Sequence, residues 1–198
     1  MLELLTRHGI GEITQPNELP ARRMPWVFDS GAFAGLKAGR AFNAKRYWAA
    51  IARIASERLA PAWVVAPDSV GDWAGTVALA MDALPRLRRE LPGVPVYLVA
   101  QDGGTEQDAA WASFDGVFVG GSLRWKLRTG ATWAAFAHRT GRPCHVGRVG
   151  QPRRVKWARR IGADSIDSCF PLWTVARMAE FLRAVRGEPT TAQMSMFE

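Results

Sequence analysis

Cysteine is scarce in this sequence, and long hydrophobic runs are missing. The two cysteines, Cys144 and Cys169, are too few for a disulfide framework or for a four-cysteine zinc site. No apolar segment approaches the roughly 20 residues that a membrane-spanning helix needs. The first residues also lack the basic and apolar regions of an export signal. We therefore expect a cytoplasmic protein that uses no metal or other cofactor and binds no membrane.

Acidic residues are also few compared with basic ones. The chain has 26 lysines and arginines against 18 aspartates and glutamates, so its net charge is +8. Such an excess favours a polyanionic partner such as nucleic acid. An arginine-rich overall composition is the alternative explanation, and the charge alone does not decide between the two.

The chain has enough apolar residues for a full hydrophobic core. Of its 198 residues, 48% are hydrophobic and 22% are charged, close to the average of globular proteins. With about 150 residues per domain, the length predicts a single domain over residues 1–186. Residues 187–198 are polar and contain a proline, which predicts a flexible tail.

Short apolar runs alternate with stretches of helical periodicity. The runs predict buried strands at residues 26–28, 63–66, 96–99, 117–119, 144–146 and 165–166. The periodic stretches predict helices at residues 43–59, 73–91, 105–112, 131–140, 152–161 and 174–186. This alternation indicates right-handed βα units and a parallel sheet.

Polar or glycine-rich residues follow most of the expected strands. They are Asp29-Ser30-Gly31, Pro67-Asp68, Gln101-Asp102-Gly103, Gly120-Gly121 and Asp167. A closed barrel would gather all of these strand ends around one mouth, whereas an open doubly wound sheet would spread some along its edge. We favour a compact (β/α)8 barrel of the TIM type, with the open sheet as the alternative.

Four of these strand-end side chains carry acid–base or hydrogen-bonding chemistry: Asp29, Asp68, Gln101 and Asp167. A single aspartate in such a place is usually a helix cap or a turn residue. Together, carboxylates can divide roles, one attacking an anomeric carbon while the other manages protons. The glutamine amide and the N–H groups of Gly120 and Gly121 suit the edge of a purine-like base.

Six motifs resemble, in family order, those of the tRNA-guanine transglycosylases. Residues 27–33 are similar to the family's DSGGF segment, and Asp68 to its next strand-end aspartate. Residues 98–104 and 117–121 resemble its VQGG and IGG segments. Residues 145–152 and 162–171 resemble the MGVG-x-P and GxDxFDxxxP segments around its nucleophile.

This resemblance implies a (β/α)8 barrel that exchanges guanine for a 7-deazaguanine at a ribosyl C1′. It makes Asp167 the nucleophile of a covalent glycosyl–enzyme intermediate, and Asp29 the second carboxylate, for proton transfer or positioning. Asp164 is the nearest rival, but only Asp167 has the family's spacing to Pro171. The residues expected to bind the base are Asp68, Gln101, Gly120, Gly121, Ser30 and Phe33.

The chain departs from the family's tRNA enzymes in three ways. It is much shorter, it lacks their zinc-binding C-terminal module, and Leu172-Trp173 replaces the Thr-Arg after the last proline. It looks more like a shortened branch that inserts 7-deazaguanines, such as 7-cyano-7-deazaguanine, into the DNA of phages and bacteria. We therefore expect DNA as the partner. The alternatives are the same exchange on tRNA or a nucleoside, and a catalytically silent barrel that binds nucleic acid.

Basic residues flank the expected site. Those proposed to contact phosphates are Arg148, Arg153, Arg154, Lys156, Arg124 and Lys126. The alternative is that these basic residues form a solvent-exposed helix face and contact no phosphate. The aromatic residues expected to stack an extruded base are Trp125, Trp173 and Phe33.

The tail contains a second possible binding motif. Residues 193–197 resemble the pentapeptide with which bacterial replication proteins bind the sliding clamp. In such a complex Gln193 would form hydrogen bonds, while Met196 and Phe197 would fill an apolar cleft. A chance match is the alternative for so short a motif.

Overall fold

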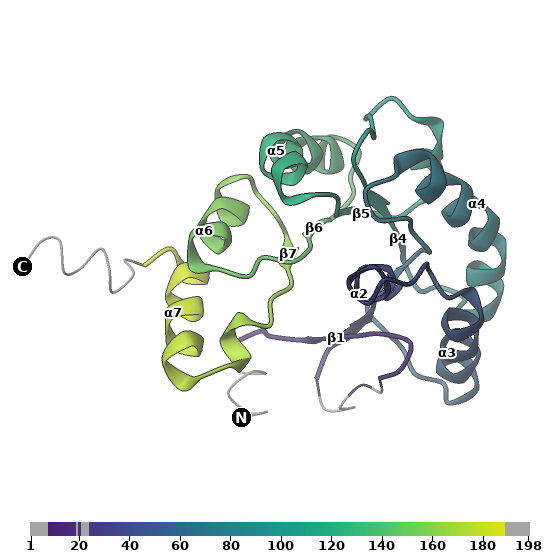
Figure 1. Cartoon of the computed structure of the whole chain (residues 1–198), viewed down its shortest axis with the longest axis horizontal. Coiled ribbons are helices and arrows are strands. Elements are labelled where there is room, and N and C mark those ends of the chain that lie inside the picture. Colours follow the sequence, from purple (N-terminus) through teal and green to yellow (C-terminus); the bar gives the residue numbers. More distant parts are fainter. Residues whose placement is uncertain (1–7, 19, 21–23, 189–198) are drawn as a thin grey trace, which may run out of the picture. The chain divides into compact units, whose positions relative to one another are not determined.

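The protein is an α/β fold in which parallel strands alternate with helices (Figure 1). The computed structural model describes residues 8–18, 20 and 24–188. Contacts within the chain divide it into two compact units, residues 1–116 and residues 117–198. The expectation of a single domain over residues 1–186 stays a prediction.

The strand order confirms the expected parallel sheet. The described residues form seven strands, one fewer than a (β/α)8 barrel has, and they follow one another in the order β1 to β7. Each pairing described below is parallel. A doubly wound sheet reverses its strand order partway, and this order shows no reversal. The topology is therefore that of consecutive βα units.

The first unit contains the pairs β1–β2, β2–β3 and β3–β4. Phe28 is in register with Val64, and Val64 in turn with Val96, so the ends of these strands lie at the same edge. The strands are β1 (Glu12–Thr14), β2 (Trp26–Phe28), β3 (Val64–Val65) and β4 (Val96–Ala100), and the helices are α2 (Ala32–Lys37), α3 (Ala44–Ser56), α4 (Trp73–Glu90) and the 3-10 helix η1 (Ala109–Ser113).

Local chemistry explains where the long helices of this unit begin. The Asn43 side chain accepts a hydrogen bond from the Arg46 N–H at the start of α3, and Asp72 caps α4 in the same way. α3 buries an apolar stripe at Tyr47, Ile51 and Ile54, as its sequence periodicity predicts. α3 and α4 pack against one another (Figure 1).

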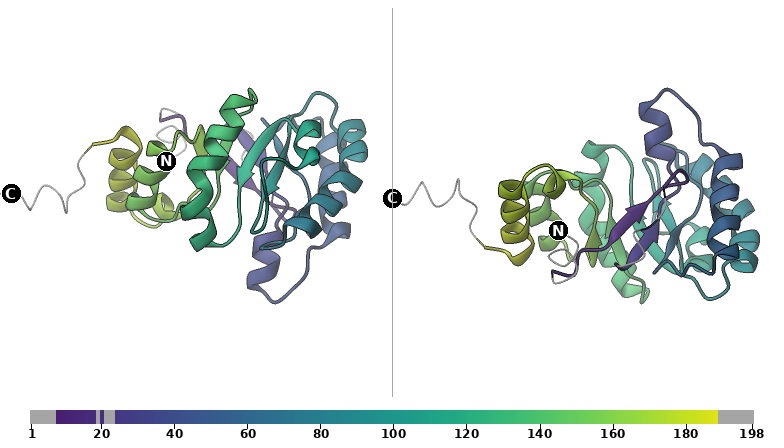
Figure 2. Two further views of the ribbon diagram at one scale, coloured as in Figure 1. Left: turned by 90° about the horizontal axis from the view of Figure 1, so that it is seen from above. Right: turned by 90° about the horizontal axis from the view of Figure 1, so that it is seen from below.

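The second unit contains the pairs β5–β6 and β6–β7. Phe118 is in register with His145, and His145 with Ser165. α6 and α7 pack side by side (Figure 2). The strands are β5 (Gly116–Val119), β6 (Cys144–Val146) and β7 (Ser165–Ile166), and the helices are α5 (Leu123–Arg139), α6 (Pro152–Arg160), η2 (Phe170–Leu172) and α7 (Val175–Arg186).

The structure corrects several expected elements. β1 and α2 were not predicted, because three and six residues are too short for a clear hydrophobic period. The helix expected at 105–112 is wrong, and the 3-10 helix η1 lies there instead. The Asp108 side chain caps η1 at the Ala110 N–H and also accepts a bond from the Trp73 indole, which fixes this short turn.

α5 begins at Leu123, eight residues before the expected start at residue 131. The Ser122 hydroxyl accepts a hydrogen bond from the Trp125 N–H and caps the helix there. Gly130 lies inside this helix, at a point that Trp157 of α6 approaches closely. A Cβ atom at Gly130 would lie 2.6 Å from the Trp157 ring.

Two expectations concern membranes and the tail. Within the part of the chain that the structure describes, no helix is both long and apolar enough to cross a membrane. The proposed clamp-binding residues Gln193, Met196 and Phe197 lie outside the described residues, so the clamp contact stays a prediction.

The close approach at Gly130 leads to a stability prediction. We expect Gly130→Leu to lower the free energy of unfolding by about 1 to 3 kcal/mol, because the new side chain overlaps the Trp157 ring. Ala131→Leu, at the neighbouring exposed position, is the control and should change stability by less than about 0.5 kcal/mol. Chemical denaturation measures both. Equal effects would show that α5 and α6 do not pack through this glycine.

Candidate functional site

Three polar side chains from successive strand ends form a buried cluster in the first unit. The Ser30 hydroxyl after β2 donates to Asp68 Oδ1 at 2.5 Å, and the Gln101 amide after β4 donates to Asp68 Oδ2 at 2.7 Å. The residues are 3%, 5% and 2% exposed for Ser30, Asp68 and Gln101, respectively. The structure thus brings together three of the predicted base-binding residues.

The orientation of this cluster is fixed from its other side. The Gln101 Oε1 atom accepts a hydrogen bond from the Gly71 N–H at 2.9 Å, which turns the amide nitrogen toward Asp68. The Ser30 hydroxyl oxygen accepts a bond from the Ala32 N–H at 3.2 Å. Each polar side chain is therefore satisfied, and a buried polar network of this kind is rigid.

Asp29 adds to the negative field that Asp68 exerts on the buried Tyr47. Tyr47 is fully buried and donates its hydroxyl to the Val65 carbonyl at 2.8 Å. Its pKa is raised well above 10.0, chiefly by burial and further by the negative charges of Asp29 and Asp68. Asp29 is half-buried, and its backbone N–H donates to the Thr14 carbonyl. Both carboxylates therefore act on the same buried phenol.

Asp167 forms the centre of a cluster in the second unit. Its Oδ1 atom lies 3.2 Å from His145 Nε2 and accepts a hydrogen bond from the Arg148 N–H at 2.9 Å. Both hydrogen bonds that the described residues make to this carboxylate go to Oδ1. No residue that the structure describes makes a hydrogen bond to the second oxygen, Oδ2.

The surroundings of Asp167 keep it ionised. Burial raises the pKa of this carboxyl, but the His145 hydrogen bond and charge, the Arg148 N–H and the Lys126 cation together outweigh it. The net pKa lies below the ordinary value of 3.8. An anionic oxygen at neutral pH is what a carboxylate nucleophile needs.

His145 is a functional candidate that the sequence analysis did not select. Its Nδ1 atom lies 2.8 Å from the Ser165 hydroxyl, and its ring packs on Phe118 with centroids 4.6 Å apart. Ser165 and Phe118 thus hold the ring with Nε2 toward Asp167. The available signal was a polar residue inside a three-residue strand whose neighbours, Cys144 and Val146, are buried and apolar.

Gly147 and Arg148 shape the backbone beside Asp167. A Cβ atom at Gly147 would lie 2.5 Å from the Phe118 ring and 3.3 Å from Asp167 Oδ1, so only glycine fits there. Arg148 has a φ of 59°, a left-handed conformation that is rare for residues other than glycine. This conformation accompanies the hydrogen bond to Asp167, while the guanidinium donates to the Gly121 carbonyl. Gly121 and its neighbour Gly120 are both buried.

Lys126 differs from the exposed phosphate contact that the sequence suggested. It is 3% exposed, and its ammonium donates to the Gly147 carbonyl. Burial first and then the positive charge of Arg148 lower its pKa to about 7, although the negative charge of Asp167 opposes the shift. Lys126 therefore supports the Asp167 loop from inside the unit.

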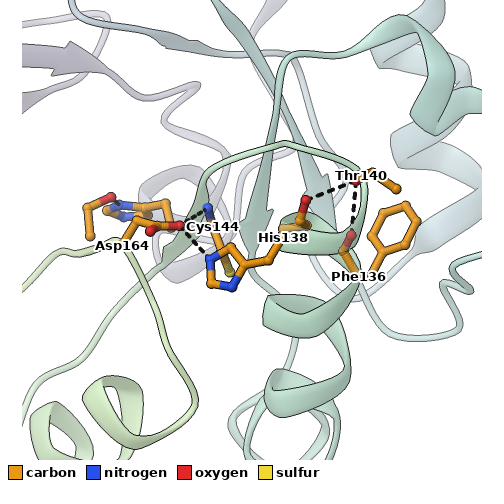
Figure 3. A network of polar contacts seen from close by, with 8 residues as sticks. Phe136, His138, Thr140, Cys144 and Asp164 are labelled. Atoms are coloured by element: carbon orange, nitrogen blue, oxygen red, sulfur yellow. Dashed lines mark hydrogen bonds and ion pairs between the residues drawn. The ribbon is translucent and has the colours of Figure 1, made fainter.

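Asp164, the rival of Asp167, has a different environment (Figure 3). Its Oδ2 atom accepts a bond from the Cys144 N–H at 2.7 Å and lies 3.0 Å from His138 Nε2. These contacts connect β6 to the end of α5, which indicates a structural role for Asp164.

The remaining predicted residues lie at various depths. Arg124 and Arg153 are exposed, and Arg148, Arg154 and Lys156 are half-buried. Trp125 is buried and packs near Trp133, so its ring is not open to a base. Phe33 is half-buried in the first turn of α2, 5.5 Å from the Lys37 ammonium. Trp173 is exposed.

Comparisons with known proteins give no relative for this chain. It matches no protein-family model, and the search of curated proteins finds no match either. Among residues 8–18, 20 and 24–188, no group of three or more histidine, cysteine, aspartate or glutamate side chains could hold a metal ion. The function is therefore argued from the two clusters.

The buried Lys126 leads to a prediction of pH dependence. Because its pKa is about 7 in the folded protein and about 10.5 when unfolded, the unfolded chain binds more protons between these values. Stability should therefore rise with pH across this range. Relative to Lys126→Met, the wild type should gain at least about 1 kcal/mol between about pH 6 and about pH 9, measured by denaturant unfolding. If the difference in unfolding free energy between the wild type and Lys126→Met does not change with pH, the Lys126 ammonium lies in solvent.

Proposed function

We propose that the chain is a base-exchanging glycosyltransferase of the tRNA-guanine transglycosylase type, which replaces guanine in DNA by a 7-deazaguanine. The observation that carries the proposal is the Asp167 carboxylate, whose pKa is lowered and whose two described hydrogen bonds both go to one oxygen. The closed (β/α)8 barrel implied by the family resemblance is part of this proposal.

The chemistry follows that of retaining glycosidases. Asp167 Oδ2 attacks the 2′-deoxyribosyl C1′, a C1′–O ester bond forms, and the C1′–N9 bond breaks with its electron pair going to guanine. The departing guanine takes up a proton. The incoming 7-deazaguanine gives up its ring N–H proton, its nitrogen attacks C1′, and the ester bond to Asp167 breaks. The nucleophile is regenerated, so no external oxidant or metal is required.

His145 and Arg148 act on Asp167 and not on the substrate. Their hydrogen bonds stabilise negative charge on Oδ1 and orient Oδ2 for attack. When the ester forms, the carboxylate loses its charge; when the ester breaks, the same two donors stabilise the anion that leaves. Asp29 is the proposed proton carrier for the departing and incoming bases.

The Ser30–Asp68–Gln101 cluster supports recognition of the base. Guanine presents N–H donors beside a carbonyl acceptor, and Asp68 and Gln101 provide carboxylate acceptors and an amide donor. Their hydrogen bonds fix the orientation of the donors and acceptors of this cluster before a base arrives. Phe33, Gly120 and Gly121 complete the proposed base-binding set.

DNA is the proposed substrate because of the charge of the chain and its exposed basic residues. The net charge of +8 and the exposed Arg124 and Arg153 suit a phosphate backbone. Arg148, Arg154 and Lys156 remain in the proposed phosphate-binding set. The same exchange on tRNA or a nucleoside, and a silent binding barrel, are the outcomes that the experiments below separate.

The aspartate pair Asp167 and Asp164 gives a matched test of the nucleophile. Incubation with guanine-containing DNA and no incoming base should trap a covalent adduct that shifts the protein band in denaturing electrophoresis. We expect no adduct with Asp167→Asn, and a loss of labelled-deazaguanine exchange by several orders of magnitude. Asp164→Asn should still form the adduct, since its contacts are structural.

The control outcomes are distinct. An adduct that survives in Asp167→Asn but disappears in Asp164→Asn would show that the wrong aspartate is assigned. Labelling of tRNA or of a nucleoside in place of DNA would change the substrate and keep the mechanism. Binding of DNA without exchange on any substrate would favour the silent barrel.

The His145 pair tests the positioning role. His145→Gln places an amide donor near the position of Nε2, whereas His145→Phe keeps a ring on Phe118 and removes both hydrogen bonds. We expect kcat for exchange to fall at least tenfold in His145→Phe with little change in KM, and to be largely rescued in His145→Gln. A kcat retained in His145→Phe and lost in His145→Gln would mean that His145 acts through the shape of its ring alone.

A further inference from the structure

A groove in the second unit lies outside the Asp167 cluster. It has a volume of about 660 Å³, and α6, the η2 segment and α7 supply its lining. The helices that border it pack side by side (Figure 2). Its residues include Gln151, Arg153, Lys156, Phe170, Arg177 and Glu180.

The charge of the groove is predominantly positive. Arg153 and Lys156 from α6 and Arg177 from α7 supply three cations, and Glu180 is the one carboxylate among the lining residues. Arg153 is exposed, while Lys156 and Arg177 are half-buried. A groove of this sign attracts a polyanion, and two of its cations lie one turn apart on the same helix.

Aromatic rings adjoin these cations. The Arg177 guanidinium lies 4.6 Å from the centroid of Trp173 and 5.3 Å from that of Phe170. Trp173 is 59% exposed, although a tryptophan normally buries most of its surface. Leu172 and Val175 beside it are exposed as well. The groove therefore combines cations with an accessible aromatic and apolar rim.

We propose that this groove binds a single strand of nucleic acid, with phosphates on Arg153, Lys156 and Arg177 and a base stacked against Trp173. Cationic grooves with accessible aromatic rings are the pattern of single-strand binding without sequence preference. The proposal rests on nucleic acid as the substrate of the proposed function. It adds a second contact, which holds the strand beside the nucleotide that undergoes exchange.

The cations are tested with a guanine-free strand. Fluorescence anisotropy of a labelled oligothymidylate, titrated over a range of salt concentrations, measures binding without any base exchange. Arg153→Ala with Lys156→Ala should reduce the slope of log affinity against log salt by about 1.4, because about 0.7 is expected per phosphate contact on a single strand. Lys45→Ala with Arg46→Ala removes the same charge from exposed positions on α3. This control should leave the slope unchanged.

The aromatic rim is tested by a conservative pair. Trp173→Ala should weaken oligothymidylate binding at least fivefold, because one stacked base is lost. Trp173→Phe should retain most of the affinity. Since Trp173 is exposed, neither change should alter the thermal unfolding of the protein. Equal affinities of Trp173→Ala and wild type would overturn the stacking contact.

The results separate this groove from the proposed function. Equal losses of affinity in the α6 and α3 double variants would show attraction by net charge only, and no loss in either would place the strand elsewhere; both overturn the proposal. Asp167→Asn should bind oligothymidylate as the wild type does. Groove variants that lose binding in a protein without exchange activity would support the groove and contradict the glycosyltransferase. Base exchange in a protein whose groove variants bind oligothymidylate as the wild type does would support the glycosyltransferase and contradict the groove.

Discussion

One carboxylate oxygen, Asp167 Oδ1, holds the second unit's candidate site together. It receives the Arg148 N–H and lies within hydrogen-bond distance of His145 Nε2. The Arg148 bond accompanies a left-handed backbone, and the His145 contact depends on a ring held by Phe118 and Ser165. The geometry of Asp167 thus depends on residues from β5, β6 and β7. Because these partners engage one oxygen, the carboxylate is anionic and oriented while the other oxygen stays available.

Three aspartates near strand ends show how surroundings give one residue type different roles. Asp68 is bound through both oxygens in a buried network, which suits the recognition of a defined hydrogen-bonding edge. Asp164 connects β6 to the end of α5 through Cys144 and His138. Asp167 has a lowered pKa, and both of its described hydrogen bonds go to one oxygen. Enzymes usually give two carboxylates different catalytic roles by placing them in environments that move their pKa values apart.

The basic residues also divide by position. Lys126 points its ammonium at the Gly147 carbonyl and supports the loop of Asp167 from within. Arg153 lies in an outward groove with Arg177, where the exposed Trp173 adds an aromatic surface. The basic residues that make up the net charge therefore have two different placements. Lys126 faces the interior of the unit, and only the groove residues Arg153 and Arg177 suit contact with a phosphate backbone. A buried lysine carries a desolvation cost that a solvent-facing arginine avoids.

The sequence by itself determined the parallel βα succession, most strand positions and the strand-end polar residues. These follow from local hydrophobic patterns and from the rule that parallel strands end at one edge. The tertiary structure decided what depends on distant neighbours: the pairing of the short strand β1, the inward Lys126 and the contacts of His145. Gly130 lies inside α5 where the Trp157 ring of another helix leaves no room for a Cβ atom, and the sequence of α5 alone does not show this contact. Similarly, the spacing to Pro171 singled out Asp167, but only the contacts of His145 and Arg148 give its carboxylate a charge and a direction.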